Sequence, residues 1–172
     1  MTMVLSFIGL PGCGKSTIAR RLQSAGGFAV VSRDIIYRNA FHPLEFTQKR
    51  KASAFVMVLD EIRRLLQEAQ PCIIDGMTFS KAHELVAVRE VARECEALFV
   101  PIHFDCPVEV AQRRIAEDAG ETSRTFTNRN QALVAEVASR FEPLPPDVLR
   151  VDATLPIKAI TGLVLNMIPS IP

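Results

Sequence analysis

The sequence lacks a large net charge of either sign, and this limits the partners it is expected to bind. Its 172 residues include 20 lysines and arginines against 19 aspartates and glutamates, so the formal net charge is only +1. Proteins that bind nucleic acid or anionic membranes over a broad surface usually carry a polycationic face. No such face is expected here, although a small basic groove is compatible with this composition.

Cysteines in paired spacing are also missing. Four cysteines are scattered along the chain, at Cys13, Cys72, Cys95 and Cys106, without the spacing of a zinc site or a disulfide framework. Three of them lie in or beside apolar segments, where a reduced thiol packs as a small hydrophobic group. Free cysteines favour a reducing compartment, and we therefore expect a cytoplasmic protein.

Long apolar runs, linkers and repeats are absent too. No apolar run approaches the length that spans a bilayer, and the N-terminus has no basic segment followed by a small-residue cleavage site. We therefore expect a soluble, unprocessed protein with no membrane partner. A chain of 172 residues without a low-complexity linker is expected to fold as one domain, residues 1–172, that buries its own core.

The sequence does contain a complete phosphate-binding motif. Residues 9–17 are Gly-Leu-Pro-Gly-Cys-Gly-Lys-Ser-Thr, which matches G-x-x-x-x-G-K-[ST]. The motif lies between an apolar run at 3–8 and an amphipathic segment at 18–22, the strand–loop–helix context that it requires. Because the glycines allow a tight turn, successive N–H groups can point at phosphate oxygens, and the following helix directs its positive end at the same charge.

This motif predicts a nucleotide-binding loop with defined roles for two side chains. Lys15 is expected to reach the β- and γ-phosphates, and the Ser16 hydroxyl is expected to bind Mg²⁺. The Cys13 thiol, near a helix N-terminus, is a candidate for oxidation or alkylation with loss of nucleotide binding. The alternative is that Cys13 contributes only its backbone N–H. The loop residues predicted to contact the nucleotide are Pro11, Gly12, Cys13, Gly14, Lys15, Ser16 and Thr17.

Apolar, β-branched runs alternate with helical patterns, which predicts an α/β fold. Continuous apolar runs are typical of strands buried on both faces, and they occur at residues 3–8, 28–31, 72–74, 98–104 and 148–151. An alternating order of this kind implies a parallel sheet with helices on both faces. Ser80 is the expected N-cap of one helix. The expected helices are at residues 47–69, 80–96, 107–118, 128–140 and 156–166.

Aspartates follow four of the predicted strands. Asp34 comes after the second strand, Asp75 after the third, Asp105 after the fourth and Asp152 after the fifth. In open α/β sheets, ligands bind outside the carboxyl ends of the strands. We therefore expect carboxylates and the phosphate loop to face one cleft.

Asp34 is the candidate general base. A hydroxyl that receives a phosphoryl group needs a hydrogen-bond acceptor opposite the γ-phosphate, and Asp34 is predicted to supply it. The alternative is that Asp34 only caps the short helix that begins there. Arg33 and Arg38 could hold an anionic acceptor group or the transferred phosphoryl group with forked hydrogen bonds. The alternative for Arg38 is a solvated surface arginine.

Asp75 is the second candidate metal residue, with Ser16. It is the carboxylate residue at the end of an apolar run, and Mg²⁺ with its water shell is usually held at that place in such folds. The alternative is turn chemistry, since Asp75-Gly76 is a strong turn pair. Because no acidic residue follows Asp75, the Asp-Glu pair that activates water in many ATPase motors is absent, which argues against a mechanical ATPase.

A lid is expected at about residues 113–129. Arg113 and Arg114 lie on the helix after the fourth strand, and the polar segment that follows contains Arg124. Such a segment could close over the nucleotide and bring arginine charge to the transition state. Arg113 and Arg114 are predicted to bind the nucleotide, and Arg114 and Arg124 are predicted to act in catalysis. The alternative is a solvated helix end with Glu117 and Asp118 as charge partners.

The three histidines offer no metal site. His103 lies within an apolar strand and is expected to be a core histidine with satisfied hydrogen bonds. His42 and His83 are isolated, and no histidine and cysteine spacing resembles a zinc site.

Taken together, these segments resemble the small P-loop kinases grouped with the 5′-polynucleotide kinase domain, within the AAA-type P-loop NTPase superfamily. Adenylylsulfate, gluconate and antibiotic kinases and zeta toxin are relatives in that group. The resemblance spans nearly the whole chain and rests on the phosphate loop and on four further segments, Val-Ser-Arg-Asp at 31–34, Ile-Ile-Asp-Gly at 73–76, Asp-Cys-Pro-Val-Glu-Val at 105–110 and Arg-Phe-Glu-Pro-Leu-Pro-Pro at 140–146.

The resemblance implies a three-layer sandwich with a five-stranded parallel sheet in the order 2-3-1-4-5. It also implies that Asp34 is the acceptor-side general base and that the loop after the last strand lies by the adenine. Two positions depart from the family pattern. The usual Asp-x-x-Arg spacing is one residue longer here, with Tyr37 in the third position and Arg38 after it, and a second lid arginine is replaced by Glu117 and Asp118.

The function expected from the sequence is ATP- and Mg²⁺-dependent transfer of the γ-phosphate to a hydroxyl of a small molecule or of a nucleic-acid 5′ end. The alternative is an ATP-binding P-loop regulatory module that hydrolyses ATP slowly or not at all. In either case we expect a monomer or a homodimer. A GTPase is disfavoured because residues 127–130, Thr-Asn-Arg-Asn, lack the lysine and the aspartate of the Asn-Lys-x-Asp motif.

Overall fold

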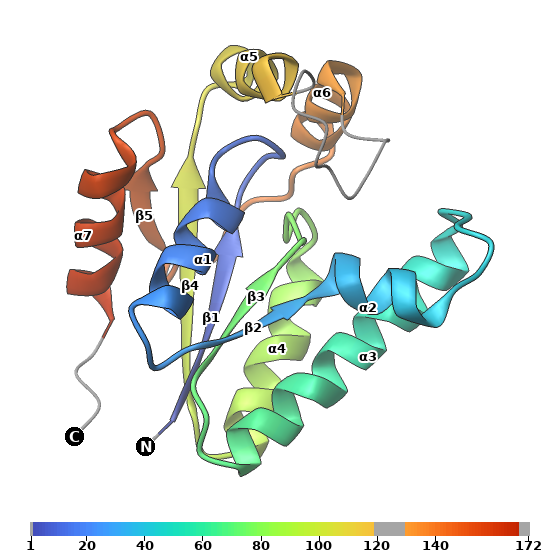
Figure 1. Cartoon of the computed structure of the whole chain (residues 1–172), viewed down its shortest axis with the longest axis vertical. Coiled ribbons are helices and arrows are strands. Elements are labelled where there is room, and N and C mark those ends of the chain that lie inside the picture. The colour runs from blue at the N-terminus through green and yellow to red at the C-terminus, as the bar shows by residue number, and fades with distance from the viewer. Residues whose placement is uncertain (1, 119–129, 169–172) are drawn as a thin grey trace.

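A computed structural model describes residues 2–118 and 130–168 of the chain. Its strands form one parallel five-stranded sheet in the order β2-β3-β1-β4-β5 (Figure 1). The expected α/β class and strand order are therefore confirmed. The strands are β1 (Met3–Ile8), β2 (Ala29–Ser32), β3 (Cys72–Asp75), β4 (Leu98–Asp105) and β5 (Leu149–Asp152).

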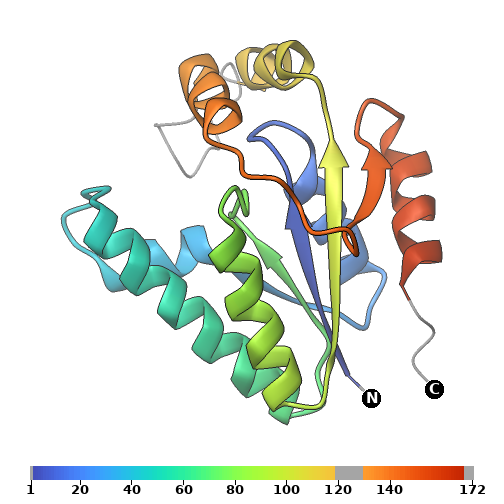
Figure 2. The same ribbon diagram turned by 180° about the vertical axis from the view of Figure 1, so that it is seen from behind.

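Helices cover both faces of this sheet. Helices α1 and α7 pack on one face and α3 and α4 on the other, while α5 and α6 lie beyond the carboxyl ends of the strands (Figures 1 and 2). The helices are α1 (Lys15–Ser24), α2 (Arg33–Ala40), α3 (Gln48–Gln67), α4 (Ala82–Glu94), α5 (Val108–Asp118), α6 (Gln131–Ser139) and α7 (Ile157–Met167). In the described part of the chain, no helix is both long enough and apolar enough to span a bilayer.

The burial of the strands follows their position in the sheet. All six residues of the central strand β1 are buried, whereas three of the four residues of the edge strand β5 are exposed. A central parallel strand touches helices on both faces, and a continuous apolar run is what such a strand requires. Alternate residues of β1 therefore enter two separate cores, with Leu5 and Phe7 on the α1 side and Val4 and Ile8 on the α3 side.

Local side-chain caps begin α2, α3 and α6. The hydroxyl of Thr47 accepts a hydrogen bond from Arg50 N at the start of α3, and the Asn130 side chain does the same for Leu133 N at the start of α6. Ser80 was expected to cap α4, and this is wrong, because Lys81 is the N-cap residue and Ser80 is buried.

The start of α4 is held by a distant residue. Glu142 accepts hydrogen bonds from Ala82 N at 2.7 Å and from Lys81 Nζ at 3.0 Å, and its own N–H donates to Ser80 O. These bonds lower the pKa of the Glu142 carboxyl, the bond from Ala82 N most of all. The segment that follows α6 crosses the α4 face of the sheet on its way to β5 (Figure 2).

Candidate phosphate and acceptor site

The phosphate loop lies at the carboxyl end of β1 and is packed tightly against α5. Gly12 has φ +86°, and a Cβ at this position would lie 2.6 Å from Ala111 O and 2.9 Å from Ile115 Cγ1. Only glycine fits such a backbone angle and such a close approach. The first turn of α1 contains no acidic residue, so the positive end of this helix is not compensated by its own side chains.

Lys15 is buried inside this loop, with 9% of its surface exposed. Its Nζ donates hydrogen bonds to Gly9 O at 2.7 Å, to Leu10 O at 2.8 Å and to Cys13 Sγ at 3.4 Å. These acceptors satisfy the three N–H donors of the ammonium group but do not neutralise its charge. Among the described residues no carboxylate forms an ion pair with Lys15, and such a buried cation is what a phosphate-binding loop needs.

Ser16 and Asp75 are brought together, as expected for a metal site. Ser16 Oγ donates to Asp75 Oδ1 at 2.7 Å, across 59 residues of sequence. A hydroxyl and a carboxylate oxygen next to the phosphate loop fit Mg²⁺, which prefers oxygen ligands and is usually held by one or two carboxylates together with substrate phosphates. The alternative role of Asp75-Gly76 as a turn is also seen, because Gly76 has φ +77° and the chain turns there.

Asp34 lies in the first turn of α2, and the cap of that helix is a different residue. Ser32 Oγ accepts the hydrogen bond from Ile35 N, so the alternative role of Asp34 as N-cap is wrong. The Asp34 carboxylate lies 3.7 Å from Arg33 Nη2 and keeps 19% of its side chain exposed. It therefore remains partly accessible to solvent.

Arg38 is on the same face of α2 as Asp34. It lies in the last turn and is half-buried, and residues four apart on a helix are neighbours just as residues three apart are. The longer spacing in this chain therefore keeps the arginine near the aspartate. Tyr37 points elsewhere, since it is 3% exposed and packs against Phe41 and Phe46.

The two arginines of α5 differ in their surroundings. Arg114 Nη1 donates to Ala153 O at 2.8 Å and so ties α5 to the connection between β5 and α7. Arg113 is exposed and lies 4.0 Å from Glu117, as the alternative of an intrahelical charge pair predicts. Arg124, and with it most of the expected lid, lies outside the described residues.

Cys13 is closed off from solvent. Only 1% of its surface is exposed, and its sulfur accepts the hydrogen bond from Lys15. Alkylation of this thiol would therefore require the loop to open.

A cavity lies at the carboxyl ends of β4 and β5, two of the strand ends where the sequence predicts a cleft. Its volume is about 500 Å³, and it is lined by Asp105, Cys106, Pro107, Arg150, Val151, Asp152 and Thr154. The Asp152 carboxylate accepts hydrogen bonds from the Thr154 hydroxyl at 2.6 Å and from Thr154 N at 2.8 Å, and these bonds lower its pKa. In the sequence, the feature that points to this cavity is an aspartate at the end of each of the two strands. In the sheet these aspartates, Asp105 and Asp152, are register partners.

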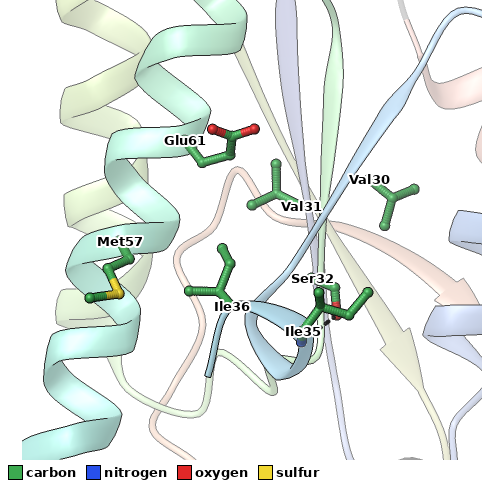
Figure 3. Close-up of a pocket in the computed structure, with 7 residues that line it drawn as sticks. All are labelled: Val30, Val31, Ser32, Ile35, Ile36, Met57 and Glu61. Carbon is green, nitrogen blue, oxygen red and sulfur yellow. Dashed lines mark hydrogen bonds between the residues drawn. The ribbon is translucent and has the colours of Figure 1, made fainter. Parts of the chain in front are cut away.

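A smaller pocket has a lining of mostly apolar residues. It has a volume of about 290 Å³ and is formed by the edge strand β2, the start of α2 and one side of α3 (Figure 3). Glu61 is its only charged lining residue, and a hydrogen bond from Arg64 lowers the pKa of this carboxyl. Nothing in its lining is suited to bind phosphate.

His103 is not the satisfied core histidine that was expected. Its Nδ1 is buried and has no hydrogen-bond partner among the residues that the structure describes. The ring is half-buried, with the Phe141 ring centroid 6.1 Å away.

The sheet order and the phosphate loop together define the fold of the small P-loop kinases, within the P-loop NTPases. Residues 4–144 match the protein family described as AAA domain, and the chain therefore belongs to that family. No curated protein sequence is significantly similar to it.

Solved structures with this fold include several kinases. A gluconokinase from Sinorhizobium meliloti 1021 is 17% identical with a TM-score of 0.69, covering 96% of this chain and 90% of its own. The Mycobacterium tuberculosis APS kinase CysC, in complex with AMPPNP and APS, is 18% identical with a TM-score of 0.72, covering 96% of each chain. A chain of the Pnkp1/Rnl/Hen1 RNA repair complex is 22% identical with a TM-score of 0.61, covering 84% of this chain and 48% of its own.

Proposed function

We propose that this protein is an ATP-dependent kinase that transfers the γ-phosphate to a hydroxyl group. The observation that carries the proposal is the arrangement at one edge of the sheet, where a buried Lys15, the linked pair Ser16 and Asp75, and the accessible carboxylate of Asp34 come from three neighbouring strand ends. Phosphoryl transfer needs charge neutralisation, in-line positioning and a group that orients the acceptor. This edge of the sheet offers a candidate for each.

The nucleotide side of the reaction is assigned to the phosphate loop. Backbone N–H groups of residues 12–17 bind the phosphates, and Lys15 adds a fixed positive charge that lies in place before ATP arrives. Ser16 and Asp75 would hold Mg²⁺, which supplies charge neutralisation at the β- and γ-phosphates. The 500 Å³ cavity beside Thr154 supports placing the adenine of ATP next to the loop after β5, as the resemblance implies.

The acceptor side is assigned to Asp34. A carboxylate within hydrogen-bond reach of the acceptor hydroxyl orients its oxygen toward the γ-phosphate and takes up its proton. Arg38, on the same helix face, and Arg33 are assigned to an anionic group of the acceptor or of the transferred phosphoryl group. Arg114, with Arg113 and Arg124, would add positive charge from the lid side.

The acceptor is a small molecule or a nucleic-acid 5′ end. The two kinases above act on different acceptors on the same fold, so the fold does not choose among them. The free state of all four cysteines supports the cytoplasm as the compartment.

The test is ATP turnover with Mg²⁺ against 5′-hydroxyl oligonucleotides, nucleosides, sugars and aminoglycosides, with Lys15→Ala as the blank. We expect turnover that rises with one acceptor class and vanishes in Lys15→Ala. In that class Asp34→Asn should lower kcat by about 10²- to 10⁴-fold, because it removes a general base, and should leave ATP affinity nearly intact. Asp60→Asn, an exposed aspartate on α3, is the matched control and should be unchanged.

Two results would contradict the assignment. Normal turnover by Asp34→Asn would remove Asp34 from the mechanism. Tight ATP binding with flat, acceptor-independent turnover across wider panels would instead favour the regulatory P-loop module.

A further inference from the structure

Gly76 and Asp34 are neighbours because two adjacent strands end at the same level. Ser32 at the end of β2 is the register partner of Asp75 at the end of β3. Asp34 follows Ser32 by two residues and Gly76 follows Asp75 by one, so the start of α2 faces the first residue after β3. The carboxylate of Asp34 therefore lies against the backbone of Gly76, the residue that follows Asp75.

The atoms nearest to a side chain added at Gly76 all belong to Asp34. A Cβ built on Gly76 would lie 3.0 Å from Asp34 Cγ, 3.2 Å from Asp34 Oδ1 and 3.2 Å from Asp34 N. Carbon atoms in contact normally stay about 3.5 Å or more apart. Any side chain at this position would therefore press on the Asp34 carboxylate and on the first turn of α2.

The connection that contains Gly76 is held in place on its other side. Asp75 Oδ1 accepts the bond from Ser16, and Thr78 O accepts a 3.1 Å bond from Gly9 N of the phosphate loop. Met77 and Phe79 are 2% and 1% exposed, and Phe79 has φ +50°. A non-glycine residue in that backbone region is strained and persists only where its surroundings impose it.

We propose that Gly76 is a positioning residue, whose missing side chain sets where the Asp34 carboxylate stands relative to Ser16 and Asp75. The proposal rests on the role of Asp34 in the proposed function. Since the β3–α4 connection is held by the phosphate loop and by its buried side chains, it cannot retreat easily from an added methyl group. Asp34, partly exposed at the start of a two-turn helix, is the group that yields.

This arrangement gives the dipeptide Asp75-Gly76 a role beyond that of a turn. The aspartate reaches the phosphate loop, while the glycine leaves room for the acceptor-side carboxylate. The distance between the two halves of the site is thus set by one residue. Misplacement of a reacting group by about 1 Å can cost about 100-fold in rate.

The experiment compares Gly76→Ala with Gly26→Ala. Gly26 also has a positive φ, +90°, but a Cβ there would meet no atom within 4 Å. Both substitutions therefore strain the backbone, and only the first crowds Asp34. Gly76→Asn is a second variant, because asparagine tolerates positive φ better than alanine and still adds a Cβ, and it serves if Gly76→Ala folds poorly.

Three readouts are needed: the thermal midpoint, the Kd for Mg-AMPPNP, and a crystal structure of Gly76→Ala. We expect both glycine variants to melt lower than the wild type and to bind Mg-AMPPNP like it. In the crystal structure the Asp34 carboxylate should be displaced by about 1 Å while the Ser16–Asp75 hydrogen bond persists. With the acceptor class found above, kcat should fall about 100-fold in Gly76→Ala at unchanged KM for ATP, and Gly26→Ala should keep the wild-type kcat.

The proposal is overturned if Asp34 keeps its position in the crystal structure, or if Gly76→Ala and Gly26→Ala have the same kcat. It is also overturned if Gly76→Ala loses Mg-AMPPNP binding, because the glycine would then serve the nucleotide side. Failure of the kinase assignment is a separate outcome, seen as wild-type protein without acceptor-dependent turnover. In that case the crystal structure still decides whether Gly76 positions Asp34.

Discussion

His103 is a histidine whose charged form the fold disfavours. It lies on β4 between its register partners Ile8 on β1 and Arg150 on β5. Burial lowers its pKa most, the negative charge of Asp105 partly offsets the effect of burial, and the positive charges of Arg150 and Lys15 lower the pKa further. At neutral pH the folded protein therefore holds the neutral ring.

This residue predicts a loss of stability in mild acid. Because the pKa of His103 is lowered in the folded state, the unfolded chain binds more protons below about pH 6.5, the ordinary histidine pKa, and the free energy of unfolding decreases as the pH falls. Urea unfolding of the wild type and of His103→Gln at about pH 7.5 and pH 5.5 measures this. The wild type should lose more stability than His103→Gln over that interval.

The control for this prediction is His83→Gln, which changes an exposed histidine on α4. It should lose as much stability as the wild type. Parallel losses in the wild type and in His103→Gln would contradict the prediction. Comparing the wild type with His103→Gln also removes the contribution of Glu84, whose pKa is raised by burial and whose effect on stability runs in the opposite direction with pH.

Residue chemistry could be predicted where it depends on a local motif. The phosphate loop identifies Lys15 and Ser16 by spacing alone, and strand ends identify Asp34 and Asp75. Partners across the fold could not be predicted in the same way. Within residues 2–118 and 130–168 His103 Nδ1 has no hydrogen-bond partner. That depends on what packs around the ring, and no neighbour in the sequence reveals it.

At the scale of elements, the phosphate loop and α5 form one packed unit. Gly12 approaches the α5 backbone at Ala111, and Arg114 of the same helix bonds to Ala153 O. The helix that begins the expected lid is therefore fixed to the loop on one side and to the β5–α7 connection on the other.

Substitution of Gly12 should separate these elements. Gly12→Ala places a methyl group 2.6 Å from Ala111 O at a positive φ, and we expect it to lower the free energy of unfolding by about 3 kcal/mol through crowding and backbone strain. Nucleotide binding should also weaken, because the loop and α5 cannot both keep their places. Chemical denaturation and titration with Mg-AMPPNP provide the two measurements.

Gly27→Ala is the matched control for Gly12. Its φ is +99° and no atom lies within 4 Å of the added Cβ, so it should cost only about 1 kcal/mol from backbone strain and leave nucleotide binding unchanged. Equal losses in the two variants would show that crowding against α5 contributes nothing.

Helix ends show where local sequence signals stop being sufficient. Thr47 and Asn130 cap α3 and α6 with their own side chains, as the capping rules predict. At α4 the expected Ser80 cap is wrong, because Glu142 arrives from a segment about sixty residues away and accepts the bond from Ala82 N. The sequence near residue 80 therefore cannot predict that the Glu142 carboxylate binds there.

For the whole molecule, the sheet couples two cores that lie on opposite faces. One core joins α1, α5, α6 and α7 to the sheet and the other joins α3 and α4, and β1 contributes alternate residues to both. Loss of either core would expose β1, so we infer that the two unfold together.

The single tyrosine provides a test of this coupling. The chain has no tryptophan and one tyrosine, Tyr37, which is buried on α2 and donates a hydrogen bond to Glu45 O. Its fluorescence reports on the α2–α3 region, whereas far-UV circular dichroism reports on all helices and strands. We expect the two urea transitions to coincide, as for a cooperative unit. An earlier tyrosine transition would instead show that α2 and its connection to α3 open as a separate unit.

The sequence by itself determined the alternation of strands and helices, the phosphate loop and the aspartates at the strand ends, because these depend on patterns within a few residues of one another. The strand order could be stated from the sequence only through the resemblance to known kinases. Tertiary structure alone decided that Asp34 lies against Gly76, that Ser16 bonds to Asp75, that Arg114 reaches Ala153 and that Glu142 holds α4. Each of these contacts joins segments far apart in the chain, and only the packing of both faces of the sheet brings them within reach.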